Sequence, residues 1–185
     1  MVFCYDYGMK IAVDQITESP KEVRFVEQLA ELNPHSGEGG LGDFRFPPLL
    51  DVNLVYYRSG REIFFHGAFA AALDGCCGRC LKRYSLPVEK EFDLVLTQEP
   101  VKAKDKELSR DELGLSFYAS NEIDLSPLIR EQVLLALPTR PLCDESCRGL
   151  CAGCGVDFNY ESCLCPPPSA DPRMAVFRRL KLGRQ

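Results

Sequence analysis

The chain has 185 residues and a formal net charge of −5, from 22 basic and 27 acidic side chains. This length suffices for a domain with a buried core, and the negative charge excludes a general nucleic-acid wrapper, which needs an excess of Lys and Arg. The first residues lack the basic and apolar regions of a signal peptide, and no apolar run is long enough to span a bilayer. A cytoplasmic protein is therefore expected.

The N-terminal part predicts one strand and one helix. Residues 10–16 alternate well enough for a short strand. Ser19 and Pro20 are typical of a helix start, which predicts a helix that ends near Asn33. Its apolar positions recur every three or four residues and share one face: Val23, Val26, Leu29 and Ala30. A glycine-rich loop follows.

Three runs of alternating apolar residues predict an antiparallel meander. Their inward positions are Leu50, Val52, Leu54 and Tyr56, then Ile63, Phe65, Phe69, Ala71 and Leu73, then Leu86, Val88, Phe92, Leu94 and Leu96. The sequence CGRC falls at the bend between the second and third strands. We therefore expect this pair of cysteines at the tip of a hairpin.

The remaining elements complete an α+β fold. Residues 98–112 are charged and predict a solvated loop, and Leu115–Ala119 predicts a short strand. Asp124–Leu137 has apolar residues at helical spacing, with a proline in its first turn, and predicts a helix that packs on the sheet. A stiff proline-rich linker and a short basic helix end the chain. The expected architecture is an antiparallel β meander or partly closed barrel, with a few packed helices and a C-terminal cysteine-rich, zinc-ribbon-like element.

The expected organisation has three parts. They are an α+β core domain at residues 1–142, a cysteine-rich metal-binding element at 143–166, and a basic C-terminal helix or tail at 167–185.

The ten cysteines are the most informative residues, and eight of them are spaced as metal ligands. Thiolates two or three residues apart bring their sulfurs within bonding distance of one tetrahedral ion without backbone strain. In a reducing compartment such clusters are more often metal sites than disulfides, although a disulfide framework remains an alternative. The candidate ligands are Cys77, Cys80, Cys143, Cys147, Cys151, Cys154, Cys163 and Cys165.

Eight ligands divide into two four-cysteine sites, and two zinc ions are expected. The preferred arrangement joins Cys77 and Cys80 to Cys143 and Cys147, and leaves the last four cysteines to close a local ribbon. A competing arrangement places residues 143, 147, 151 and 154 around one ion and leaves CGRC free. Cys4 and Cys76 are surplus and are expected to be ordinary thiols.

A structural role is expected for these sites, since catalytic zinc keeps an open position beside a general base. His35 and His66 lack a supporting motif, and no P-loop, dinucleotide-binding or nucleophile motif occurs. The sequence therefore predicts no enzyme and no small-molecule substrate. The alternative function is an iron–sulfur or thiol-redox protein that uses the clustered cysteines. A thioredoxin-like role for CGRC is disfavoured, because that chemistry needs a strand-to-helix junction.

The C-terminal segment is the one strongly basic stretch. It carries five basic side chains and no acidic ones, and it is the candidate surface for RNA or an acidic partner: Arg173, Arg178, Arg179, Lys181 and Arg184.

Four segments occur in a specific order: CGRCL, EIDLSPLIREQVLLALPTRPLC, CRGLCAGCGVDFNYESCLC and DPRMAVFRRLK. In this combination the chain resembles the YceD family of bacterial and plastid proteins, from about Gly67 to Lys181. The family's CxRCL element falls on Cys77, Arg79, Cys80 and Leu81. Its IDL-helix-LP element falls on Ile123, Asp124, Leu125, Leu137 and Pro138.

The resemblance implies a role in ribosome biogenesis, because family members are associated with accumulation of large-subunit ribosomal RNA. The expected partner is that RNA, a pre-ribosomal particle or a ribosomal protein. No association with a membrane is expected. The leading expectation is a non-catalytic, zinc-stabilised binding protein.

Overall fold

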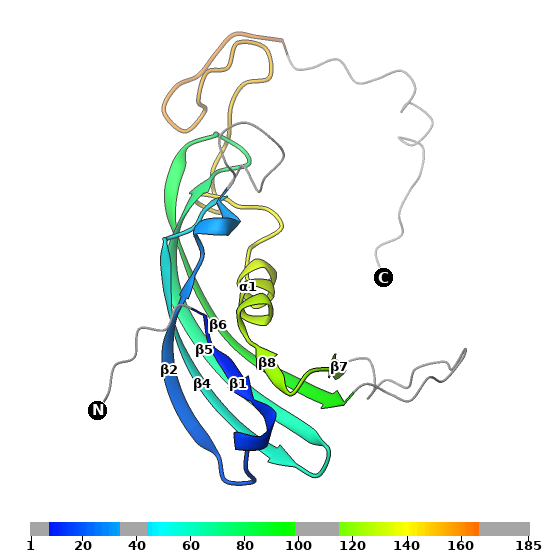
Figure 1. Ribbon diagram of the computed structural model, residues 1–185. Helices are drawn as coiled ribbons and strands as arrows, with labels where there is room; N and C mark the ends of the chain where they lie inside the picture. The colour runs from blue at the N-terminus through cyan, green and yellow to red at the C-terminus, as the bar shows by residue number, and fades with distance from the viewer. Residues whose placement is uncertain (1–7, 34–43, 99–114, 167–185) are drawn as a thin grey trace, which may run out of the picture.

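The computed structural model describes residues 8–33, 44–98 and 115–166. Within these ranges the chain is mostly extended, with one α-helix and two short 3-10 helices (Figure 1). The strands are β1 (Lys10–Ala12), β2 (Lys21–Gln28), β3 (Phe44–Arg45), β4 (Leu49–Ser59), β5 (Glu62–Cys76), β6 (Arg83–Gln98), β7 (Leu115–Tyr118) and β8 (Glu122–Asp124). The helices are η1 (Val13–Gln15), η2 (Ala30–Leu32) and α1 (Ser126–Leu135).

A curved, open sheet is the main layer, with strands in the order β2-β4-β5-β6-β7 and β3 added beside β5. The meander β4-β5-β6 is antiparallel, as predicted, whereas β7 runs parallel to β6. The expected partly closed barrel is wrong, because β2 and β7 lie at opposite edges and do not pair. The α+β class agrees with the structure.

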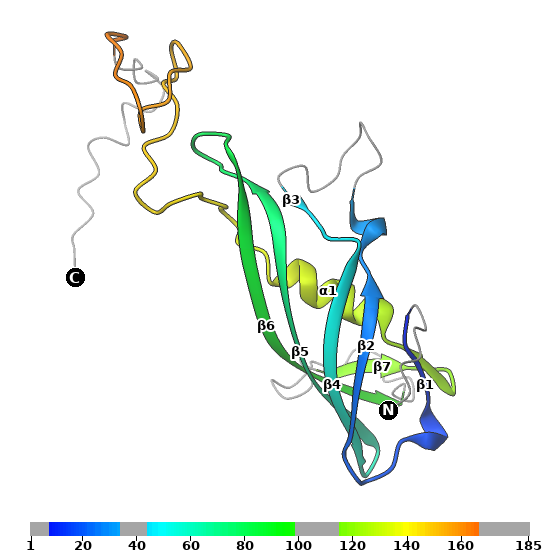
Figure 2. The same cartoon turned by 90° about the vertical axis from the view of Figure 1, so that its left-hand side faces the viewer.

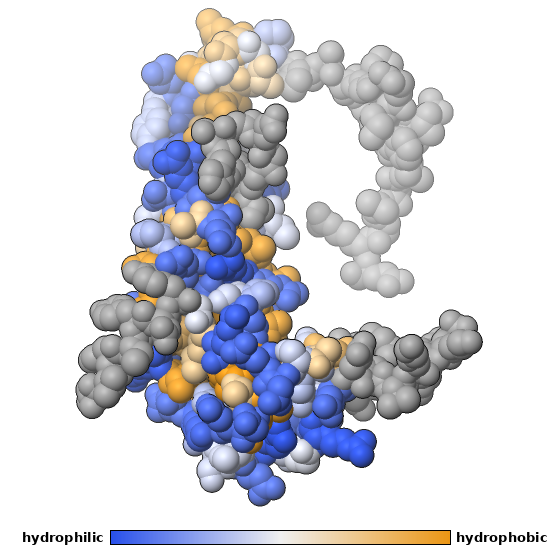
Figure 3. Space-filling view, viewed as in Figure 1, coloured by the Kyte–Doolittle hydropathy of each residue, from blue (hydrophilic) through white to orange (hydrophobic). Residues whose placement is uncertain are grey.

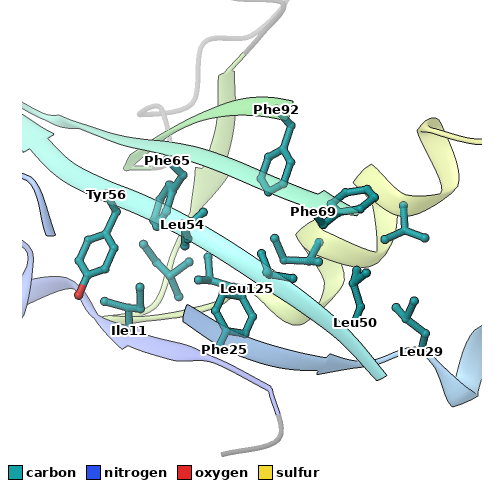
Figure 4. Close-up of a cluster of buried hydrophobic side chains, with 14 of the residues drawn as sticks. Ile11, Phe25, Leu29, Leu50, Leu54, Tyr56, Phe65, Phe69, Phe92 and Leu125 are labelled. Atoms are coloured by element: carbon teal, nitrogen blue, oxygen red, sulfur yellow. The ribbon is translucent and has the colours of Figure 1, made fainter. Parts of the chain in front are cut away.

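A second layer covers only one face of the sheet. It consists of α1 and a two-stranded sheet of β1 and β8 (Figure 1). The hydrophobic core lies between the layers, where side chains of the sheet meet Ile11 and Leu125 of the covering layer (Figure 4). Ile129 of α1 belongs to the same core. Phe65 and Ile129 are fully buried there. We call this covered side the inner face and the opposite side the outer face.

The helix predicted from Pro20 to about Asn33 is wrong. The segment forms β2, which pairs antiparallel with β4, followed by η2. Val23, Phe25 and Glu27 alternate toward the inner face, but the charged residue at the third position hides the period of two. The apolar residues that remain visible, such as Val26, then mimic helical spacing.

The other expectations agree more closely or lie outside the described ranges. The predicted strand 10–16 is shorter, since η1 replaces its second half, and α1 is shorter than predicted by two residues at each end. The charged loop and the basic C-terminal segment fall almost wholly on residues that the structure does not describe. The predicted boundary between the core domain and the cysteine-rich element, at residues 142 and 143, stays a prediction. No helix in the described ranges combines the length and apolarity that a membrane span requires.

Candidate metal centres

The first candidate centre begins at the tip of the β5–β6 hairpin, where CGRC forms a tight turn. The N–H of Leu81 donates to the carbonyl oxygen of Cys77 at 2.9 Å, and the N–H of Arg79 points to the Cys77 sulfur at 3.5 Å. Leu81 adopts a left-handed φ of 60°, which lets the chain leave the turn and enter β6. This turn directs both sulfurs to one side, as in a metal knuckle.

The segment after α1 brings two more cysteines against this knuckle. The N–H of Gly78 donates to the carbonyl of Pro141 at 2.8 Å. The Arg79 guanidinium donates from Nη1 to the carbonyl oxygens of Cys147, at 2.7 Å, and of Glu145, at 2.9 Å. Arg79 thus binds the backbone of the cysteine-rich segment and holds it beside the hairpin tip.

Four sulfurs meet at this junction, from Cys77, Cys80, Cys143 and Cys147, all within 4.8 Å of one another. Cys77 and Cys147 have sulfurs 3.8 Å apart, and those of Cys80 and Cys143 are 3.6 Å apart. Tetrahedral zinc with Zn–S bonds of about 2.3 Å separates its sulfurs by about 3.8 Å. The donor set therefore fits one such ion.

The second candidate centre is local to the cysteine-rich segment. The sulfurs of its four cysteines also lie within 4.8 Å of one another: Cys151, Cys154, Cys163 and Cys165. The N–H of Gly153 points to the Cys151 sulfur at 3.4 Å, and Gly155 adopts a positive φ of 77° as it closes the turn. This is a second knuckle, and it is built like the first.

The two sets differ in burial. In the first set Cys77 is completely buried and Cys80 and Cys147 nearly so, whereas in the second Cys154 is exposed. In Figure 1 the cysteine-rich segment lies at the end of the molecule remote from β7, and Figure 3 shows residues of high hydropathy gathered over it. Solvent therefore reaches the second set more easily than the first.

Hydrogen bonding and mutual proximity push the thiol pKa values apart within the first set. Burial opposes ionisation of Cys77, but backbone N–H groups of three neighbouring residues outweigh it and lower its pKa to about 6. Burial and hydrogen bonds with the other three sulfurs raise the pKa of Cys143 to about 12. Four adjacent thiolates repel one another, so their full ionisation needs a cation among them.

The second set shows the same contrast. Backbone N–H groups of Cys154 and Gly153 lower the pKa of Cys151 to about 6. Hydrogen bonds with the other sulfurs, that of Cys154 first, raise the pKa of Cys165 to about 12. A divalent cation would compensate the charge of both sets in the same way.

Two residues near the sulfurs were not predicted from the sequence. Asn159 donates from Nδ2 to the Cys147 sulfur at 3.4 Å and accepts the N–H of Arg148 at 2.8 Å, so it connects the first set to the segment that holds the second. Tyr84 packs against the cluster of Cys77 and its neighbours. Neither belongs to a recognisable motif, so only the folded arrangement identifies them.

The other candidate residues are separate from both sets. The Cys76 thiol donates a hydrogen bond to the Leu81 carbonyl oxygen at 3.3 Å, and Cys76 belongs to neither four-cysteine set. His66 is exposed and contacts Asp93 on the outer face. CGRC joins two antiparallel strands, so it lacks the strand-to-helix setting of a thioredoxin motif. His35, Cys4 and the five basic residues after 172 lie outside the described ranges.

Comparison with known families identifies the chain. Residues 65–181, more than half of it, match the family described as "Large ribosomal RNA subunit accumulation protein YceD". The chain belongs to the YceD family. The YceD match begins in β5 and takes in all eight candidate ligands. The family is named for accumulation of large-subunit ribosomal RNA.

Curated relatives agree with YceD membership. An uncharacterized protein of Mycobacterium tuberculosis is 35% identical over 116 residues, which are 61% of this chain and 53% of the relative. The Large ribosomal RNA subunit accumulation protein YCED homolog 1, chloroplastic, of Arabidopsis thaliana is 27% identical over 63% of this chain and 43% of the relative. Its Zea mays counterpart is 26% identical over 72% and 55%. The chain thus spans about half the length of the curated relatives it matches. No solved structure matches it significantly.

Proposed function

We propose that this protein is a non-catalytic, zinc-stabilised binding protein that supports accumulation or processing of large-subunit ribosomal RNA. One observation carries the proposal: two four-cysteine sets whose sulfur spacing fits a tetrahedral ion. Membership of the YceD family supplies the biological setting. The relatives from Arabidopsis thaliana and Zea mays carry the accumulation role in their names.

The eight cysteines would hold two zinc ions as closed, all-thiolate sites. Such an ion would supply charge compensation and a cross-link, without an open coordination position. The first set would fasten the hairpin tip to the segment after α1, and Arg79 and Asn159 would orient its ligands through the contacts described above. The protein would thereby present one rigid end to a partner.

The proposed partner is large-subunit ribosomal RNA or a protein of the pre-ribosomal particle. Basic side chains would contact phosphate or an acidic protein surface: Arg173, Arg178, Arg179, Lys181 and Arg184. The proposal includes a cytoplasmic location. It includes no membrane partner and no small-molecule substrate.

Metal analysis of the purified protein tests the structural half. Elemental analysis should find about two zinc ions per chain and no visible absorption, whereas iron with a visible spectrum would favour the iron–sulfur alternative. Cys77→Ser and Cys151→Ser should each lose one ion. Cys76→Ser is the matched control, since Cys76 lies beside the first set without joining it, and it should keep both.

Cells depleted of the protein test the functional half. Large-subunit ribosomal RNA should fall relative to the small-subunit RNA and recover with the wild-type gene. The Cys77→Ser gene should fail to restore it, and the Cys76→Ser gene should succeed. A chain truncated after Pro172 should keep its zinc but no longer co-sediment with pre-ribosomal particles. Unchanged ribosomal RNA after depletion would refute the proposed function.

A further inference from the structure

The outer face of the main sheet has no cover among the described residues. Helix α1 and the β1–β8 pair pack only on the inner face, and Figure 2 looks onto the outer face with α1 behind the sheet. Side chains alternate along each strand, so the exposed positions of β4, β5 and β6 lie on this outer side, apart from Gln98 at the end of β6. A sheet face of this length is a surface available to a partner.

The outer face carries a shallow groove of about 320 Å³. Its floor is the small Ala68, which faces Asn53 on β4 and Glu91 on β6 in register. Further along β5 the outward positions are again alanines, Ala70 and Ala72, both exposed. The strand therefore forms a low track between two neighbours with longer side chains, and this shape suits an extended polypeptide.

Acidic side chains dominate the rim and surroundings of this groove. Glu22, Glu91 and Asp93 line it directly. Over all the outward positions of β2 to β6 the acidic residues outnumber the arginines seven to three: Glu22, Asp51, Glu62, Asp74, Glu89, Glu91 and Asp93, against Arg24, Arg45 and Arg83. One arginine, Arg24, is 3.7 Å from the Glu22 carboxylate. The face therefore repels RNA phosphate and also a second copy of itself.

Aromatic rings lie beside the groove, stacked on its lining residue His66. Tyr57 stacks on Phe64 with ring centroids 5.3 Å apart and on His66 with centroids 5.9 Å apart. His66 also contacts Asp93 across the β5–β6 pair. A cationic side chain in the groove would meet carboxylates on its rim and an aromatic surface beside it, which together favour arginine or lysine.

We propose that the outer face binds an extended, arginine- or lysine-rich segment of a partner protein, with one cationic side chain in the groove between His66 and Glu91. Charge complementarity carries this choice of occupant, together with the track of alanines. The proposal takes its setting from the proposed function, because proteins that accompany ribosomal RNA carry excess Lys and Arg for phosphate binding. It assigns this face to protein and leaves RNA to another surface.

Fluorescence anisotropy with the zinc-loaded full chain tests the proposal. The probe is a labelled peptide that alternates arginine with alanine, and its matched control replaces each arginine with glutamine. The arginine peptide should bind and the glutamine peptide should not. The double variant Glu91→Lys/Asp93→Lys should weaken binding at least about tenfold, because it places like charges in the groove.

A matched variant separates the face from net charge. Glu122 on β8 and Glu131 on α1 are exposed residues of the covering layer. Glu122→Lys/Glu131→Lys changes the net charge equally and should alter affinity by less than about twofold, given that exposed charges remote from the peptide are screened by salt. Equal losses in the two double variants would overturn the proposal. Tyr57→Ala should weaken binding by about threefold to tenfold through loss of the aromatic contact.

Two further arms decide between occupants. A labelled single-stranded RNA that binds the wild type but not the Glu91→Lys/Asp93→Lys variant would overturn the proposal in favour of RNA. A chain truncated after Pro172 that binds the arginine peptide more than about tenfold tighter would assign the face to the chain's own basic segment instead. Zinc content and ribosomal RNA levels are separate readouts, so a failure of the proposed function leaves this peptide test interpretable.

Discussion

Arg130 on α1 donates from Nε to Oε1 of Glu27 on β2 at 2.9 Å, and the Glu27 side chain is completely buried. Ser126 donates its hydroxyl to the other carboxylate oxygen, also at 2.9 Å. Both oxygens of this buried acid are therefore satisfied from the helix. This contact fixes the first turns of α1 against the edge strand of the sheet.

Removal of one partner from this pair should destabilise the protein strongly. Arg130→Ala leaves a buried carboxylate without its cation and should lower the free energy of unfolding by about 3 kcal/mol. Glu27→Leu/Arg130→Leu replaces both charges with apolar groups and should recover much of that loss. Urea denaturation of the two variants measures both values. Glu31, which is exposed and also contacts Arg130, provides the control: Glu31→Ala should cost less than about 1 kcal/mol.

Zinc should leave the two centres at different rates. Cys154 is exposed, whereas Cys77 is completely buried, so a chelator meets the second set first. Release followed with a chromogenic zinc indicator should show two phases of equal amplitude. Cys154→Ser should abolish the fast phase and leave the slow one. A single phase for the wild type would contradict the difference in burial.

Zinc uptake should release protons at neutral pH. The pKa values of Cys143 and Cys165 are raised to about 12, so both thiols are protonated in the metal-free protein and must ionise to bind. The pKa values of Cys77 and Cys151 are lowered to about 6, so these two are already thiolates at pH 7. Zinc affinity should therefore fall as pH falls, most steeply below pH 6. Calorimetric titrations in buffers of different ionisation enthalpy count the protons released, and a pH-independent affinity would refute the assignment.

Tyr84→Phe should stabilise the metal-free protein. The Tyr84 hydroxyl oxygen is buried and lacks a hydrogen-bond partner among the described residues, so its removal should gain about 1 kcal/mol. With zinc bound the gain should be about the same, because no cysteine sulfur lies within hydrogen-bond distance of this hydroxyl in the described residues. Thermal unfolding with and without zinc measures both. Tyr160→Phe is the control, because the Tyr160 hydroxyl is exposed and accepts from Lys82.

Strand patterning and cysteine spacing predicted the three central strands of the main sheet and the grouping of the cysteines. The alternating runs located β4, β5 and β6, because every second residue of these strands is buried and this period is visible in the local sequence. The same alternation fixes which residues face each other in the β4–β5 and β5–β6 pairs. The hairpin position of CGRC followed directly from them. The grouping of the eight sulfurs is that of the preferred arrangement. The competing arrangement, which leaves CGRC free, does not match it. Occupation by metal stays a prediction.

What the sequence could not predict depends on long-range pairing. Glu27 occupies an inward strand position only because Arg130, about a hundred residues later, neutralises it. No local pattern encodes such a partner, so β2 resembled a helix. The open sheet was missed for a similar reason: whether β2 meets β7 depends on curvature and on the elements that fill the inner face. Asn159 and Tyr84 were missed because their neighbours come from distant segments.

The first four-sulfur set joins residues that are 70 positions apart in the chain. During translation the hairpin tip emerges long before Cys143 and Cys147 have been added, so a nascent chain exposes Cys77 and Cys80 as a half-complete chelate. Such a chelate binds weakly and exchanges easily. The first set is consequently complete only once residue 147 has been added, and a product terminated before that residue lacks Cys147 or both of the partners that meet the hairpin tip.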